Sequence, residues 1–180
     1  MYRRNGFTLI ELMVVLAIVG LTLSLAVPRL RGSVAAGHTA AETAALSETL
    51  LQAMDQSTIS GNKVVVCASD DGNSCNGSVD WTPGWIAFED ADGDRSREPG
   101  EALLHAHPRL PHDVRLRSST GRTRIVFQPH GGVNAGSNVT FTFCDSRGAS
   151  KASTMVLANS ARMRTGTASS KQAEACLGQG

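Results

Sequence analysis

The sequence lacks the short motifs that carry most enzymatic chemistry. It has no G-x-S-x-G nucleophile turn, no H-E-x-x-H zinc motif, no P-loop and no glycine-rich dinucleotide turn. It also has no C-x-x-C pair, no internal repeat and no low-complexity tract. These absences argue against an enzyme, so we expect no catalytic residue and no cofactor.

The chain also has little net charge. Its 17 Lys and Arg residues nearly balance 16 Asp and Glu residues, and the net charge of +1 taken alone argues against a nucleic-acid binder. The average conceals a pattern, because residues 61–101 have a net charge of −6 and residues 102–180 one of +7. With 180 residues and 41% apolar content, the chain can build one packed domain.

A long apolar run is present at residues 7–27, where 21 residues contain a single charge, Glu11. As a helix the run would span about 31 Å, enough to cross a bilayer. Arg3 and Arg4 precede it, and this charge places the N-terminus in the cytoplasm. A secretory signal peptide would have a shorter apolar region, and a plain anchor does not explain a carboxylate that costs about 2.5 kcal/mol or more in lipid.

Residues 6–11, GFTLIE, resemble the processing site of type IV pilins and type II secretion pseudopilins. The resemblance implies that a prepilin peptidase cuts after Gly6 and that the new N-terminal residue, Phe7, is N-methylated. It also implies an assembly role for Glu11. A buried carboxylate needs a cation, and the Phe7 ammonium of a neighbouring subunit can supply one in a filament.

Beyond the apolar run, residues 33–57 are rich in Ala, Leu, Glu and Gln, which are strong helix formers. Spacings of three and four residues predict a stripe that packs on the domain's own sheet, formed by Leu46, Leu50, Ala53, Met54 and Ser57. Pro28 is expected to end or kink the first helical run, and Gly61 to stop the second. The pattern predicts one long, kinked helix from Phe7 to about Ser60.

Short β-branched and aromatic runs follow the helix, separated by Gly, Asn, Asp and Pro. They predict six or seven strands, of which the clearest are residues 64–66, 85–88, 114–117, 124–127, 139–143 and 154–157. A helix followed by strands indicates an α+β domain.

This strand region is similar to the H-type pseudopilins, also called FimT/GspH-like minor pilins. The matching residues are Cys67 to Cys75, Trp81, Gly84, Trp85, Phe88, Asp90, Asp92-Gly93-Asp94 and Gly100-Glu101. The resemblance implies a pilin-like α+β fold, with a long N-terminal transmembrane and amphipathic helix packed on an antiparallel, two-sheet C-terminal domain. It also implies partnership with other pilins and with prepilin peptidase in a pilus or a secretion pseudopilus.

These features together predict a domain organisation. Residues 1–6 form a prepilin leader, residues 7–27 a transmembrane helix, residues 28–60 its amphipathic continuation, and residues 61–180 a periplasmic β-rich domain. The chain is expected to be a single-pass protein of the inner membrane, in contact with its lipid, and part of a filament once assembled.

Four cysteines lie beyond the apolar run, in a compartment that is oxidising for an exported domain. Two disulfides are expected, and three pairings are possible. We favour Cys67 with Cys75, which closes a small loop, and Cys144 with Cys176, which ties the tail to the last sheet. A zinc site is the alternative, but the spacings do not favour it.

Two groups of residues contain potential metal ligands, and we interpret both as structural. The first is a set of histidines expected at the surface: His105, His107, His112 and His130. The second is residues 90–101, whose acids fall at positions 1, 3, 5, 9 and 12 of an EF-hand calcium loop. Because Arg95 occupies the template's glycine position and no helices flank the loop, we expect a solvated hairpin loop and no metal.

The C-terminal region is basic. Residues 160–166 are similar to the Gly-Arg-x-Arg tail motif of FimT-type minor pilins, with Ala161 in place of the glycine, and this implies double-stranded DNA as a partner in natural transformation. The DNA-binding candidates are Arg162, Arg164, Lys151, Arg147 and Lys171. The alternatives are a solubilising face, or a contact with the acidic segment of a neighbouring subunit.

Two functions therefore remain open from the sequence. The first is a minor pilin of a type IV pilus that binds DNA without sequence preference. The second is a structural H-type pseudopilin of type II protein secretion with no DNA role.

Overall fold

The computed structural model describes residues 8–178, so the predicted processing residues Gly6 and Phe7 lie outside the described part. The chain divides into two compact units, residues 1–34 and residues 35–180. Its elements are α1 (Leu9–Ser60), β1 (Lys63–Ala68), β2 (Trp85–Asp90), β3 (Leu103–His107), β4 (Val114–Ser118), β5 (Arg124–Phe127), β6 (Val139–Asp145), η1 (Ala149–Lys151), β7 (Ser153–Leu157), β8 (Met163–Thr167) and α2 (Ser170–Leu177).

Helix α1 is assigned as helix without interruption from Leu9 to Ser60. Pro28 lies inside it and does not end it, although proline removes one backbone hydrogen bond from a helix. Just beyond the last turn, Gly61 has a φ of +73°, a left-handed conformation that suits glycine and stops the helix where the sequence indicated.

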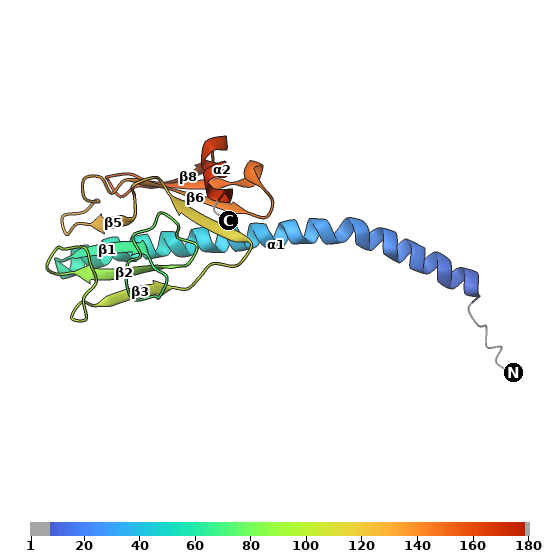
Figure 1. The fold of residues 1–180 in the computed structure, drawn as a ribbon, viewed down its shortest axis with the longest axis horizontal. Coiled ribbons are helices and arrows are strands. Elements are labelled where there is room, and N and C mark those ends of the chain that lie inside the picture. Colours follow the sequence, from blue (N-terminus) through green and yellow to red (C-terminus); the bar gives the residue numbers. More distant parts are fainter. Residues whose placement is uncertain (1–7, 179–180) are drawn as a thin grey trace. The chain divides into compact units, whose positions relative to one another are not determined.

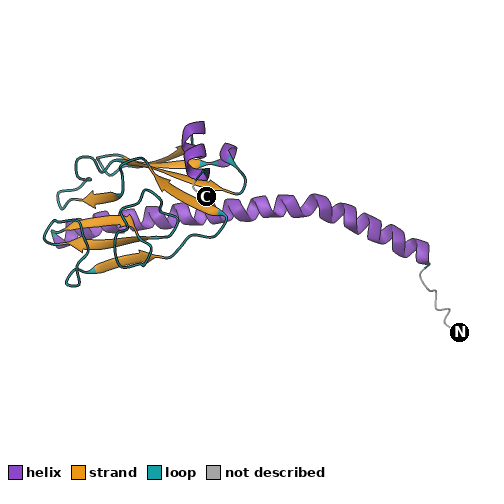
Figure 2. Ribbon diagram, in the orientation of Figure 1, coloured by secondary structure: helices purple, strands orange, loops and turns teal. Residues whose placement is uncertain are grey.

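The second unit contains two four-stranded antiparallel sheets (Figures 1 and 2). The strand orders are β3-β2-β1-β5 in the first sheet and β4-β6-β7-β8 in the second. In the first sheet, β1 lies in the centre and every residue of the strand after Lys63 is buried. This arrangement is the pilin-like α+β fold with two sheets that the sequence predicted.

The predicted stripe of α1 forms part of the main core of this unit. Leu46, Leu50 and Ala53 are at most 1% exposed, and they share one hydrophobic cluster with side chains from both sheets. The partners include Val64, Val66, Trp85, Phe127, Phe141, Phe143 and Met155. At about 25 cal/mol for each Å² of apolar surface removed from water, this burial is what holds the helix and the two sheets together.

Two strands and one α-helix were not predicted from the sequence, nor was the short 3-10 helix η1. Strand β3 lies at a sheet edge with mostly exposed residues, so it has no apolar alternation to reveal it. Strand β8, MRTGT, also lies at a sheet edge. Its residues are mostly exposed and polar, so it too has no apolar alternation that would predict a strand. Helix α2 has only 8 residues and a capping box, in which Ser169 and Gln172 each accept a hydrogen bond from the other's backbone amide.

Both favoured disulfides are present. Cys67 is joined to Cys75 across the loop after β1, and Cys144 of β6 is joined to Cys176 of α2. Cys144, Cys176, Ala152 and Ala173 form a small buried cluster of their own beneath α2. The second disulfide therefore attaches α2 to the second sheet.

Candidate assembly helix and basic face

The first unit presents an apolar helix whose start is capped by its own residues. The side-chain oxygen of Glu11 accepts a hydrogen bond from the Thr8 amide over 2.9 Å, and the Thr8 hydroxyl oxygen accepts one from the Glu11 amide over 3.3 Å. This reciprocal pair is a capping box, in which the glutamate satisfies a free amide at the helix start. The spacing Thr-x-x-Glu is typical of such a capping box and is present in the sequence, where Glu11 was expected only to contact a neighbouring subunit.

Beyond this cap, α1 exposes large apolar side chains over several turns. They include Leu9, Ile10, Leu12, Met13, Leu16, Ile18, Leu21 and Leu23, each more than half exposed. The helix contains a stretch with a mean hydropathy of 2.5, long and apolar enough to cross a membrane. A surface of this kind is stable only in lipid or against other apolar helices.

The second sheet has one face turned away from the core. Phe141, Phe143 and Met155 point into the core, so the alternate residues of the same strands point outward. Val156 of β7 and Thr142 of β6 are two of these outward-pointing residues. In the strand register, Arg164 of β8 lies opposite Val156 and Arg117 of β4 lies opposite Thr142. Arginines from opposite edge strands of the sheet therefore share its outer face.

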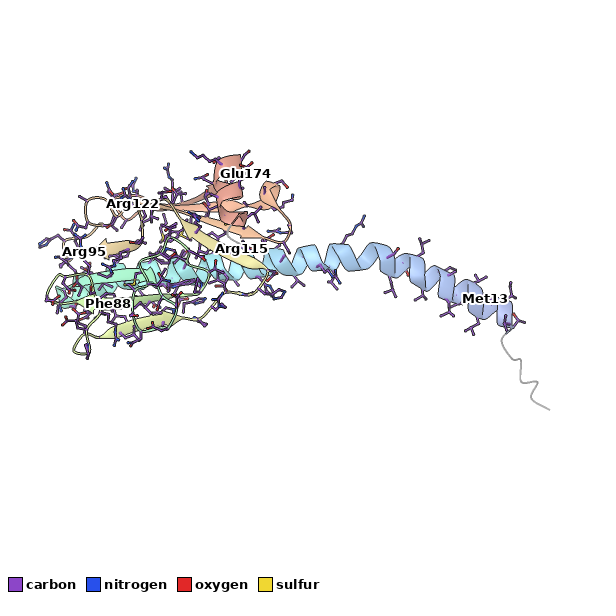
Figure 3. All side chains as sticks on the ribbon, in the orientation of Figure 1. Met13, Phe88, Arg95, Arg115, Arg122 and Glu174 are labelled. Atoms are coloured by element: carbon purple, nitrogen blue, oxygen red, sulfur yellow. A yellow bond between two sulfur atoms is a disulfide. The ribbon has the colours of Figure 1, made fainter. Side chains whose placement is uncertain are left out.

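Two connected surface depressions gather these cations. The first is lined by Arg122 and Arg164, and the second by Arg117 and Lys171. The depressions share three lining residues, Ser119, Thr120 and Thr140, so the four cationic side chains surround one continuous surface. We call this surface, together with Arg162, the basic face. Figure 3 labels Arg122 of the basic face and Glu174 of the neighbouring helix α2.

Three of the cations of the basic face are exposed to a ligand, whereas Arg117 and Arg122 are half-buried. Arg162, Arg164 and Lys171 are exposed, and none of them forms an ion pair with another described residue. The Arg122 side chain is oriented by its Nε atom, which donates to the Asn138 carbonyl over 2.9 Å. An oriented guanidinium loses less entropy when it binds an anion than a free one does.

Ala161, which replaces the motif glycine, keeps a glycine-like backbone. Its φ is +58°, in the left-handed region that glycine adopts freely and alanine rarely does. The Ala161 amide donates to the Ala158 carbonyl, and the Ala158 amide donates to the Arg162 carbonyl, which closes the turn between β7 and β8. The turn that presents Arg162 and Arg164 therefore survives the substitution.

The other two predicted DNA-binding residues lie differently. Arg147 directs its guanidinium at Asp145, with Nη2 2.6 Å from Oδ2, and these hydrogen bonds raise the pKa of Arg147. Its guanidinium group is therefore already paired with a carboxylate of the same domain. Lys151 is exposed in η1, between β6 and β7. Arg117 and Arg122, in contrast, belong to the basic face but were not among the predicted binding residues. The closely spaced arginines between positions 115 and 124 in the sequence could have indicated them.

The histidine pair His105-x-His107 lies on one face of β3, with ring centroids 6.1 Å apart. The two rings are half-buried rather than at the surface, so the sequence expectation is wrong on this point. His107 stacks on Trp85 and places Nε2 2.8 Å from a Glu42 oxygen, which joins β3 to α1. Burial lowers the pKa of His105, and the nearby His107 contributes.

An apolar N-terminal helix with a processing motif, followed by a two-sheet domain, defines a subunit of a pilin-type filament. The family model described as type II transport protein GspH matches residues 42–161, and that of the prokaryotic N-terminal methylation motif matches residues 1–27. The chain belongs to the GspH family, whose members are structural, non-enzymatic pseudopilins and minor pilins.

Solved structures show the same fold at low sequence identity. The type IV minor pilin FimU of Pseudomonas aeruginosa matches with a TM-score of 0.56 and 14% identity, over 78% of this chain and 92% of that one. The minor pseudopilin EpsH from the type II secretion system of Vibrio cholerae matches with a TM-score of 0.52 and 9% identity, over 73% and 97%. No curated protein sequence matches the chain significantly.

Proposed function

We propose that this chain is a minor subunit of a type IV pilus and that its basic face binds the phosphate backbone of double-stranded DNA. The observation that carries the proposal is the gathering of Arg117, Arg122, Arg164 and Lys171 around one continuous surface, beside Arg162. Guanidinium groups suit phosphate because they donate paired hydrogen bonds and keep their charge.

The same geometry limits how DNA would be recognised. The face combines the outer side of a sheet with Lys171 of the short helix α2, which is fastened to that sheet by Cys176, so among the described residues no free helix or ribbon projects from it to enter a groove. Its neutral neighbours are mainly Ser, Thr and Asn, so no aromatic side chain is placed to stack on a base. Binding should therefore be independent of sequence and should weaken steeply with salt.

The N-terminal part of the proposal concerns processing and assembly. Prepilin peptidase cuts after Gly6 and Phe7 becomes the methylated N-terminus, as the matching methylation motif supports. The apolar helix anchors the chain in the inner membrane, with the two-sheet domain in the periplasm. On assembly, Glu11 exchanges its hydrogen bond with Thr8 for the cationic N-terminus of a neighbouring subunit.

A second candidate function is a structural pseudopilin of type II secretion. The match to the type II transport protein family over residues 42–161 favours it. In that case the basic face would contact an acidic surface on another pseudopilin, and binding to DNA would be absent.

The test measures DNA binding by the full chain in detergent micelles, by fluorescence anisotropy of a labelled duplex. We expect binding whose logarithm falls linearly with the logarithm of the salt concentration, with a slope of about −0.9 for each phosphate contacted. Arg162→Ala/Arg164→Ala should reduce the size of that slope by about two.

The matched control is Arg29→Ala/Arg31→Ala, which removes the same charge from exposed positions on α1. This control should bind DNA as the wild type does. Equal losses in the two double variants, or no salt-sensitive binding by the wild type, would refute the DNA proposal and leave the structural pseudopilin.

A further inference from the structure

The loop that follows β2 brings three carboxylates together. Asp90 ends β2, and one carboxylate oxygen from each of Asp90, Asp92 and Asp94 lies within 4.8 Å of the others. Like charges at such distances repel one another, so a loop of this shape needs a compensating interaction.

The backbone of the loop aims these side chains inward. Asp90 Oδ1 accepts hydrogen bonds from the amides of Gly93 and Arg95, each over 3.1 Å. Gly93 and Arg95 both have positive φ, +85° and +68°. Arg95 occupies the position where a calcium loop has glycine, and it adopts the backbone conformation for which that glycine is selected. The objection that Arg95 raised is therefore removed, although a strand rather than a helix precedes the loop.

The second and independent observation is the burial of the Asp90 carboxylate. Asp90 is 2% exposed, and its Oδ2 is buried without a hydrogen-bond partner among the described residues. A buried carboxylate oxygen that has lost water and gained no donor is strongly destabilising. A bound cation would satisfy it.

The nearby basic side chains do not supply that cation. Arg97 donates to Asn73, and Arg95 lines a depression beside β5 with Arg122 and Arg124. Lys63 lies opposite Asp90 in the sheet register, with its ammonium group near Gly93. Within the described part of the chain, however, none of these groups comes within 4.0 Å of an oxygen of the three carboxylates.

We propose that Asp90, Asp92 and Asp94 bind a calcium ion. The ligands are all oxygens, which excludes the soft metals that select cysteine or histidine. Calcium tolerates irregular oxygen sets, whereas magnesium demands a near-ideal octahedron. Glu101 stabilises the loop by accepting hydrogen bonds from the Ala91 and Glu98 amides. With three carboxylates, the affinity should resemble that of extracellular calcium modules, with a Kd of about 10⁻⁴ to 10⁻³ M.

Isothermal titration calorimetry of the full chain in detergent micelles, with calcium chloride after chelator treatment, tests this site. We expect one calcium ion per chain and a rise in the thermal unfolding midpoint with calcium concentration. Asp92→Asn/Asp94→Asn changes two exposed side chains and should weaken binding by about tenfold or more, since ligand charge sets calcium affinity. Glu174→Gln, an exposed acid on α2, is the matched control and should bind normally.

The variant Lys63→Met tests whether a bound calcium ion or the Lys63 ammonium group compensates the negative charge of the three carboxylates. A calcium site predicts tighter calcium binding in this variant, because a neighbouring positive charge is removed. The proposal is overturned if the wild type binds no calcium, or if the aspartate variant and the Glu174→Gln control bind it equally. Neither result would bear on Arg164 and Lys171 of the basic face, because β8 belongs to the other sheet and α2 is joined to that sheet.

Discussion

Thr39 of α1 donates its hydroxyl hydrogen to Asp145 of β6 over 2.6 Å. Arg147 donates to the same carboxylate from Nε and Nη2, and its backbone amide does so as well. Asp145 is 4% exposed, so this hydrogen-bonded group connects the helix to the second sheet inside the domain. Burial raises the pKa of Asp145, but the hydrogen bonds from Arg147 and Thr39 outweigh it and hold the pKa below its usual range.

The first prediction concerns this carboxylate. Asp145→Asn should lower the free energy of unfolding at pH 7 by about 1–3 kcal/mol, because Arg147 loses its ionised partner. A depressed pKa in the folded state stabilises the protein above the unfolded value of about 3.9, and this stabilisation is lost as the pH falls through the folded value. Urea unfolding at pH 7 and pH 3 should show a smaller difference between the two proteins at pH 3. An unchanged difference would mean that the charge of Asp145 does not matter.

The second prediction concerns the turn before β8. Ala161→Gly should raise the free energy of unfolding by about 0.5–1 kcal/mol, since glycine relieves the cost of a left-handed alanine. Ala135→Gly is the control, because Ala135 is exposed in another turn and has no positive φ. It should be neutral or slightly destabilising. A stability gain in both variants, or in neither, would contradict the role given to the φ of Ala161.

Sequence reasoning found the elements whose apolar pattern is strong. The stripe with Leu46 and Leu50 and the apolar alternation of β6 were predictable from the sequence. Residues that pack on one core recur with the period of the helix or of the strand that carries them. It missed β8 and α2, where edge pairing and a disulfide hold polar residues in place. Nor could it show that Ala161 and Arg95 adopt glycine conformations, because only the surrounding backbone determines φ at a residue that disfavours the left-handed region.

The basic face and the loop with Asp90, Asp92 and Asp94 illustrate the same limit. The net charges of −6 for residues 61–101 and +7 for residues 102–180 predicted two oppositely charged regions. The strand register decides which cations lie together, because it places Arg117 and Arg164 on one face of the sheet. Arg147 is not part of this group, since it forms an ion pair with a residue only two positions away. The charge pattern therefore gave the region but not the membership of the site.

The third prediction compares the two disulfides. Cys144 and Cys176 are 32 residues apart, whereas Cys67 and Cys75 are only 8 apart. Because a longer closed loop restricts the unfolded chain more, Cys144→Ser/Cys176→Ser should cost about 3–4 kcal/mol and Cys67→Ser/Cys75→Ser about 2–3 kcal/mol. Thermal unfolding of both double variants checks the order. Equal costs would show that loop length does not set the stabilisation, and four free thiols in the wild type by peptide mapping would contradict both pairings.

The last prediction concerns processing, at residues outside the described part of the chain. Gly6→Ala should block removal of the leader, because the resemblance to prepilins places the scissile bond directly after this glycine and a side chain there obstructs the peptidase. Intact mass measurement of membrane-extracted protein would show the leader still attached and no methyl group on Phe7. Gly20→Ala is the matched control, since a methyl group at that position of α1 has no described atom within 4 Å apart from the backbone of the surrounding helical turns. It should mature normally, and normal maturation of Gly6→Ala as well would place the cleavage site elsewhere.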